Sequence, residues 1–175
     1  VYMKNFGEFY NNQIESAGAI ILSRTQKVSA EKLTAAVAER RITKEYLAVL
    51  RGHPEKDSDT LTDLLFRDAA HNKSYVVQRM RKGVREAVLE YRIVRQTQDA
   101  CLAEITLHTG RTHQIRVQFA SRKHPLWGDG KYGSRVKGAI ALQSCGLQFV
   151  HPDTGRIMNF TLPLPDTAPW NLFAE

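Results

Sequence analysis

The sequence predicts an α+β fold built on a mixed, mostly antiparallel sheet. Many short segments are wholly apolar or alternate apolar with polar residues, as strands do, whereas only two segments have the spacing of a substantial helix. The strand-like segments follow one another as hairpins and do not alternate with helices, which argues against a doubly wound nucleotide-binding fold. With 175 residues and no clear linker, we expect residues 1–175 to form one domain.

The first part of the chain predicts a buried strand followed by a helix. Residues 18–23 form a short apolar run that begins with glycine. Between residues 26 and 40, apolar residues recur at helical spacing with charged residues opposite, and Ser29 can cap this helix. Residues 46–50 then predict a central strand.

The middle and the end of the chain predict strands joined by polar turns. Residues 53–59 contain a proline among charged residues and should form an exposed turn. Strands are expected at residues 60–66, 73–77, 86–94 and 101–108, and the last two should form an antiparallel hairpin. Another hairpin is expected at residues 147–162, because Pro and Gly lie between its two strand-like runs.

The segment at residues 109–116, Thr-Gly-Arg-Thr-His-Gln-Ile-Arg, predicts the start of the second helix. Because a strand ends directly before it, the free N–H groups of the first helical turn should lie beside the sheet, where they and the nearby arginines favour an anion such as phosphate. Ile115 and Phe119 should bury one face of this helix. The alternative is a purely structural helix with Arg116 on its solvent side.

Composition favours a polyanionic partner. The chain has 25 Lys and Arg residues against 18 acidic ones, a net charge of +7, which speeds the encounter with nucleic acid. Cys101 and Cys145 lack the spacing of a metal or redox motif, and we interpret both as reduced core residues. No apolar stretch approaches the ~20 residues that span a bilayer. The residues from Val1 onward do not show the charged and then apolar pattern of a signal peptide. We therefore expect a cytoplasmic monomer with no membrane partner.

Four motifs, in the right order, resemble the RluA-type pseudouridine synthase family. Residues 109–116 are close to the family signature, and residues 41–52 resemble its second motif, a strand with Tyr-Leu-Ala that ends in Gly. Residues 124–133 resemble its His-Pro, Gly-Asp and Tyr-Gly segment, and residues 141–149 its last core strand. The resemblance implies a curved mixed sheet with a central cleft. It also implies isomerisation of uridine to pseudouridine in ribosomal or transfer RNA, without a metal or nucleotide cofactor.

The resemblance assigns catalytic and base-binding roles to residues at the motif positions. Arg116 would pair with the catalytic carboxylate, and Tyr46 would stack on the base and help to move the proton from carbon. Leu142 would line the base pocket. The structural alternatives are a surface arginine, a core aromatic residue and a core leucine.

Other cations should lie around the target uridine. Arg111 and His113 are expected to contact RNA phosphate or to organise the turn, and Lys131 belongs to the same basic rim. Residues 79–85 carry four cations around Gly83, which suits a hairpin tip that follows an RNA backbone. The alternative for these four is an ordinary solvated surface.

The family's first active-site motif, approximately His-Arg-Leu-Asp, is altered in this chain. Counting back from the strand at residues 18–22 places Gln13 where the family has its catalytic Asp. A loop two residues shorter would place Glu15 there, with a carboxylate one methylene longer, and a displacement on the order of 1 Å can cost ~100-fold in rate. The Lys-Pro-x-Gly strand that usually begins the domain is also absent, so we expect an N-terminally incomplete domain.

Three interpretations of this alteration stay open. The chain is an active enzyme that uses Glu15, a fragment whose catalytic loop is lost or changed, or a catalytically inactive RNA-binding paralogue such as a ribosome-assembly factor. A basic domain that binds another protein is a further alternative.

Overall fold

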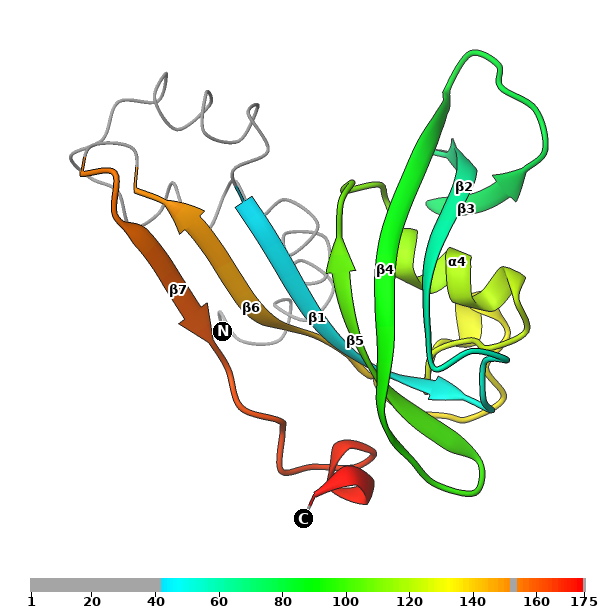
Figure 1. Cartoon of the computed structure of the whole chain (residues 1–175). Coiled ribbons are helices and arrows are strands. Elements are labelled where there is room, and N and C mark those ends of the chain that lie inside the picture. The colour runs from blue at the N-terminus through cyan, green and yellow to red at the C-terminus, as the bar shows by residue number, and fades with distance from the viewer. Residues whose placement is uncertain (1–41, 152–153, 175) are drawn as a thin grey trace, which may run out of the picture. The chain divides into compact units, whose positions relative to one another are not determined.

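The computed structural model describes residues 42–151 and 154–174 (Figure 1). The chain divides into two compact units, one made of Lys44–Gly146 with Thr161–Glu175 and the other of Val1–Thr43 with Leu147–Phe160. The strand predicted at residues 18–23, the helix predicted at residues 26–40, and both Gln13 and Glu15 lie outside the described residues.

The larger unit is built on an antiparallel sheet. Its strands are β1 (Ile42–Arg51), β2 (Ser58–Asp68), β3 (Lys73–Val77), β4 (Val84–Gln96) and β5 (Ala100–Leu107). They lie in the order β3-β2-β4-β5-β1, and every neighbouring pair among them is antiparallel. The first half of β6 (Leu142–Val150) follows beside β1. The predicted α+β class with a mostly antiparallel sheet is confirmed.

The smaller unit contains, among its described residues, the second half of β6 and most of β7 (Ile157–Thr161), which is adjacent to it. The rings of Phe149 and Phe160 stack with their centroids 6.0 Å apart. The Gln148 side chain donates a hydrogen bond to the Asn159 side chain at 2.8 Å. The two strands therefore form the hairpin that Pro152 and Gly155 predicted.

The connection between β3 and β4 corrects one prediction. Residues 79–85 were expected to form a hairpin tip, but β3 and β4 do not pair, because β2 lies between them. A tight turn at residues 69–72 returns β3 onto one side of β2, and β4 then takes the other side. Side-chain alternation shows which residues share a face of the sheet, but not which neighbouring strand each one pairs with.

Helix α4 (Gln114–Ser121) packs across the β2 and β3 end of this sheet (Figure 1). Its Val117 joins Leu65 and Ala87 in a buried cluster. Its Phe119 meets the ring of Tyr91 edge-on, with centroids 5.3 Å apart. Ile115 and Phe119 are both buried, so the predicted apolar face of this helix is confirmed.

At β1 and β5, the other face of the sheet is covered by the C-terminal segment. Two short 3-10 helices complete the described part of the chain: η1 (Gly130–Tyr132) and η2 (Trp170–Phe173). Trp170 and Phe173 of η2 pack against Val49 and Leu102, which lie opposite each other on β1 and β5. The sheet thus buries apolar side chains on both faces, and α4 and the residues that follow it are held against a fixed surface.

Both cysteines are free. Burial raises the pKa of Cys101 to about 12 and that of Cys145 to about 11, so both thiols are protonated at neutral pH. In the described ranges, no helix is both long and apolar enough to cross a membrane.

Candidate active site

Tyr46 and Arg116 lie on the same side of the sheet. Tyr46 is directly opposite Ile105 on β5, and Ile105 is directly opposite Tyr91 on β4. Side chains that are directly opposite in antiparallel strands project from the same face. Because Tyr91 contacts Phe119 of α4, the buried side chain of Tyr46 also projects toward the face that carries α4 and Arg116.

Arg116 forms a two-bond ion pair with Asp129. Its Nε donates to Oδ2 at 2.7 Å, and a terminal nitrogen, Nη2, donates to Oδ1 at 2.8 Å. The side chains of Arg116 and Asp129 are only 12% and 0% exposed, and the guanidinium carbon lies 5.0 Å from the centroid of the Tyr132 ring. Such parallel charge-assisted bonds fix a guanidinium in one orientation. Asp129 is therefore the carboxylate that holds Arg116 in the described part of the chain.

The backbone around Asp129 explains why this acid points inward. Gly128 has a φ of +77°, and a Cβ at this position would collide with the carbonyl oxygen of Ala139. Asp129 then caps η1, since its side chain accepts a hydrogen bond from the N–H of Tyr132. The Gly-Asp pair is part of the family-like segment at residues 124–133, but no role was predicted for Asp129. The sequence did contain one indication of a role for Asp129, because an acid between two glycines can occupy a tight turn that only glycine permits.

His113 organises the turn before α4. It has a left-handed φ of 55° and is 4% exposed. Its Nδ1 lies 3.0 Å from the hydroxyl of Tyr132, which accepts a hydrogen bond from the N–H of Ser74 at 2.8 Å. These two contacts connect the imidazole of His113 to Ser74 of β3 through the Tyr132 hydroxyl.

The charge state of His113 follows from its surroundings. Burial first, and then the positive charges of Arg116 and Lys131, lower its pKa to about 4. The imidazole is therefore neutral at neutral pH. Of the two roles expected for His113, this geometry favours organisation of the turn over contact with phosphate.

The first turn of α4 is bound back to the sheet by Gln114. Its Oε1 accepts hydrogen bonds from the N–H of Arg111 at 3.0 Å and the hydroxyl of Thr109 at 2.9 Å, and its Nε2 donates to the carbonyl of Val88 at 3.1 Å. The polar residues at the helix entry thus engage the protein itself, whereas the sequence had suggested an anion there.

The remaining predicted site residues lie around this turn or on β6. The Nε of Arg111 donates to the carbonyl of Glu86 at 2.9 Å. Lys131 is exposed, and its Nζ donates to the carbonyl of Asn72 at 3.1 Å. Leu142 is half-buried at the start of β6. The structure thus gathers Arg111, His113, Arg116 and Lys131 around the turn between β5 and α4.

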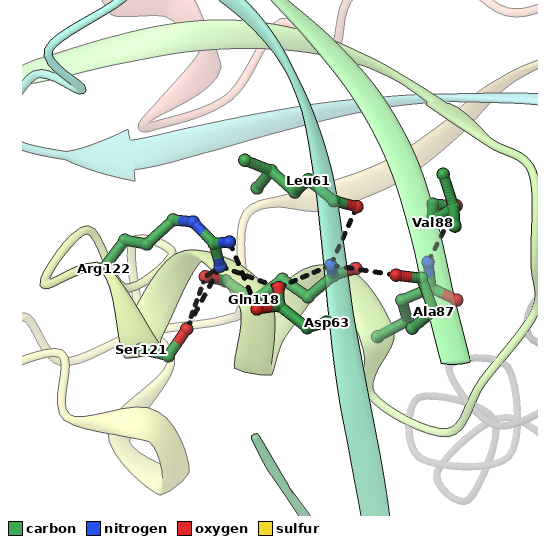
Figure 2. A network of polar contacts seen from close by, with 8 residues as sticks. Leu61, Asp63, Ala87, Val88, Gln118, Ser121 and Arg122 are labelled. Atoms are coloured by element: carbon green, nitrogen blue, oxygen red, sulfur yellow. Dashed lines mark hydrogen bonds and ion pairs between the residues drawn. The ribbon is translucent and has the colours of Figure 1, made fainter. Parts of the chain in front are cut away.

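A second polar network anchors α4 to β2 and β4 (Figure 2). Gln118 is fully buried, and its Nε2 donates to the Asp63 carboxylate at 2.8 Å and to the carbonyl of Leu61 at 3.2 Å. Arg122 binds the same carboxylate through both of its terminal nitrogens, at 2.8 and 3.2 Å. The Oε1 of Gln118 has no hydrogen-bond partner among the described residues. We call Gln118, Asp63 and Arg122 the α4 anchor, because they fix the helix that carries Arg116.

No group of three or more His, Cys, Asp or Glu side chains within residues 42–151 and 154–174 could hold a metal ion. The charged groups gathered at the turn are instead one buried ion pair and several cations, an arrangement that suits binding of an anionic molecule.

Comparison with known proteins defines the class. Residues 14–121 match the RNA pseudouridylate synthase family. A Bacillus subtilis protein named uncharacterized RNA pseudouridine synthase YlyB is 34% identical over 155 residues, which are 87% of this chain and 50% of that protein. The ribosomal large subunit pseudouridine synthase D of Haemophilus influenzae is 34% identical over 168 residues, again 87% and 50% of the two chains.

The solved structures agree on the fold. The human RNA pseudouridylate synthase domain containing 4 protein has a TM-score of 0.67 at 19% identity, over 82% of this chain and 66% of that one. Its relative, domain containing 1, has a TM-score of 0.66 at 23% identity, over 79% and 61%. The antiparallel sheet with α4 across it is thus the fold of pseudouridylate synthase domains.

The chain belongs to the RNA pseudouridylate synthase family, and within it to the RluA type. It spans about half the length of the curated relatives that it matches.

Proposed function

We propose that this chain is the catalytic-type part of an RNA pseudouridine synthase that isomerises uridine to pseudouridine in ribosomal or transfer RNA. Family membership supports the reaction, and the relatives named ribosomal large subunit pseudouridine synthase D favour ribosomal RNA as the substrate. The observation that carries the proposal is the placement of Tyr46 on the sheet face covered by the helix of Arg116.

The reaction needs a group that stabilises the ribose carbon and a group that moves a proton. The bond between uracil N1 and ribose C1′ breaks, the uracil turns, and its C5 bonds to C1′. The proton lost from C5 is balanced by one gained at N1. A carboxylate next to C1′ serves the first need, and the phenol of Tyr46, by stacking on the base, serves the second.

The geometry of Arg116 suits the role of holding that carboxylate. Asp129 engages Nε and Nη2, while Nη1 has no hydrogen-bond partner in the described segments. A guanidinium fixed in this way presents its remaining N–H groups to a second acid without further loss of side-chain entropy. We propose Glu15 as that acid, Leu142 as part of the base pocket, and Arg111 and Lys131 as contacts to the flanking phosphates. His113 acts through Tyr132 and positions the turn.

The reaction is tested by tritium release. Ribosomal and transfer RNA that carry uridine with tritium at C5 release the label to water when pseudouridine forms. We expect release from ribosomal RNA by the full chain, a loss of at least tenfold for Tyr46→Phe, and a similar loss for Glu15→Gln. The first loss follows from the removal of a proton-transfer group, which contributes roughly 10²–10⁴-fold in other enzymes, and the second from the removal of the charge that stabilises C1′. Absence of release from both RNAs would overturn the proposed reaction.

The altered first motif favours a second candidate function, a catalytically inactive RNA-binding paralogue that assists ribosome assembly. It predicts RNA affinity that falls steeply with salt and no tritium release. In either case we propose RNA as the partner, no cofactor, a monomer and a cytoplasmic location. The net charge of +7 supports the RNA partner.

A further inference from the structure

Positive charge is concentrated at one end of the sheet, in the segment that runs from the end of β2 to the start of β4. Residues 66–86 contain six Lys and Arg residues against two carboxylates, so more than half of the net charge of +7 lies in 21 residues. Residues 78–83, which join β3 to β4, are all exposed, and they include Arg79, Arg81 and Lys82. None of these three cations forms an ion pair within the described ranges.

Two aromatic rings lie beside these cations. Phe66 of β2 and Tyr75 of β3 are directly opposite each other, so both project from one face. The guanidinium of Arg81 lies 5.1 Å from the centroid of the Phe66 ring, and the Lys73 ammonium lies 5.5 Å from that of Tyr75. Tyr75 is 42% exposed and Met80 is 62% exposed. The result is a row in which two adjacent rings, the half-buried Phe66 and the exposed Tyr75, lie between two cations.

This row is on the face of the sheet opposite to α4. Leu65 and Ser74, the chain neighbours of Phe66 and Tyr75, project toward α4: Leu65 packs with Val117, and the Ser74 hydroxyl donates to the carbonyl of Thr112 at 2.6 Å. Because side chains alternate along a strand, Phe66 and Tyr75 project the other way. The row is therefore separate from the face that carries Tyr46 and Arg116.

Lys73 connects the two faces. It is on β3, which is the outermost described strand at this end of the sheet. Its Nζ is 5.5 Å from the ring of Tyr75 and also 5.5 Å from the ring of Tyr132, which contacts Arg116. A polyanion that follows the positive charges can therefore pass around β3 from one face to the other.

We propose that Phe66, Lys73, Tyr75, Arg79, Arg81 and Lys82, here called the hairpin patch, bind unpaired nucleotides of the RNA substrate. An exposed ring accepts the face of an unstacked base whatever its sequence, and the cations on both sides neutralise neighbouring phosphates. A duplex keeps its bases stacked on one another and offers none to Tyr75. Six cations against the two carboxylates, Asp68 and Glu86, leave residues 66–86 with a net charge of +4. The hairpin patch deepens the proposed function and rests on RNA being the partner.

The contribution of the cations is tested by fluorescence anisotropy of the full chain with a labelled oligouridine of about 12 nucleotides. The variant is Arg79→Gln with Lys82→Gln, and the matched control is Arg135→Gln with Lys137→Gln, another exposed pair whose loss lowers the net charge equally. We expect the patch variant to reduce the slope of log affinity against log salt by about 1.4, or ~0.7 for each phosphate contact, and the control to leave it unchanged. Equal losses in the two variants would overturn the proposal, because they would show a general charge effect.

The contribution of stacking is tested at Tyr75. Tyr75→Ala should weaken oligouridine binding roughly tenfold, whereas Tyr75→Phe, which keeps the ring, should stay within about twofold. A duplex RNA of the same length should bind the parent and Tyr75→Ala alike. The proposal is overturned if Tyr75→Ala binds oligouridine as well as the parent does.

These binding measurements do not depend on isomerisation. If tritium release is absent but the hairpin patch variants still weaken oligouridine binding, the proposed reaction fails and the hairpin patch stands. If release occurs and the variants bind normally, the hairpin patch fails and the reaction stands.

Discussion

The ion pair between Arg116 and Asp129 allows a sharp prediction about stability. Asp129→Asn changes one oxygen to nitrogen and leaves the volume almost unchanged, so it creates no cavity. It removes the counter-charge of a guanidinium that is only 12% exposed, and it can turn an amide donor toward Nε or Nη2. Removing one partner of a buried pair leaves an uncompensated charge, which costs about 3–5 kcal/mol of unfolding free energy.

The assay is thermal and urea unfolding of the full chain, followed by far-UV circular dichroism. For a chain of this size, ~3–5 kcal/mol corresponds to a fall in Tm of about 6–20 °C. Glu104→Gln is the matched control, because Glu104 also receives an arginine hydrogen bond at 2.7 Å, from Arg92, but the two side chains are 48% and 69% exposed. An exposed pair contributes at most ~1 kcal/mol. Equal losses for Asp129→Asn and Glu104→Gln would refute the idea that burial gives the Arg116 pair its importance.

Three further predictions concern the residues that position α4 and the turn before it. Because the pKa of His113 falls from 6.5 in the unfolded chain to about 4 in the folded one, only the unfolded state gains a proton between these values. Stability should therefore fall by about 2–3 kcal/mol as the pH drops from 6.5 to 4, a loss absent from His113→Gln in urea titrations across this range. Gln118→Leu removes the donors to Asp63 and Leu61 and should cost about 1–3 kcal/mol by the same titration at pH 7; an unchanged midpoint would show that the α4 anchor contributes nothing. Gly128→Ala should cost about 3 kcal/mol or more, because a Cβ there meets the Ala139 carbonyl, whereas Gly133→Ala, whose Cβ would enter open space, should cost only about 1 kcal/mol in unfolding measurements.

The strands were predictable because alternation of side chains is a local property. The expected strand at residues 73–77 is β3 itself, and those at residues 60–66 and 86–94 lie inside β2 and β4. The partner of each strand was not predictable in the same way. β4 pairs with β2 although β3 lies between them in the sequence, and residues of both strands pack against α4.

The candidate site was only partly visible in the sequence. The helix that begins before Arg116 and the strand of Tyr46 could be predicted, because the residue order of both segments is characteristic of the family. The pairing of Arg116 with Asp129 was not, since it joins a helix to a turn 13 residues later through one buried contact. His113 shows a different limit of sequence reasoning. A histidine next to arginines suggests a phosphate ligand, but its hydrogen bond to Tyr132 and its burial hold it neutral inside the protein.

The outermost position of β3 has a consequence for how copies of this chain behave together. A terminal strand offers unpaired backbone groups on its free side, and another molecule can pair with them. Lys73 on β3 and the cations directly after it repel a second copy that approaches along this side. Concentrated salt screens that repulsion. In the absence of RNA, we therefore expect self-association to rise with ionic strength, which is a practical reason to purify the protein in dilute salt or with a bound polyanion.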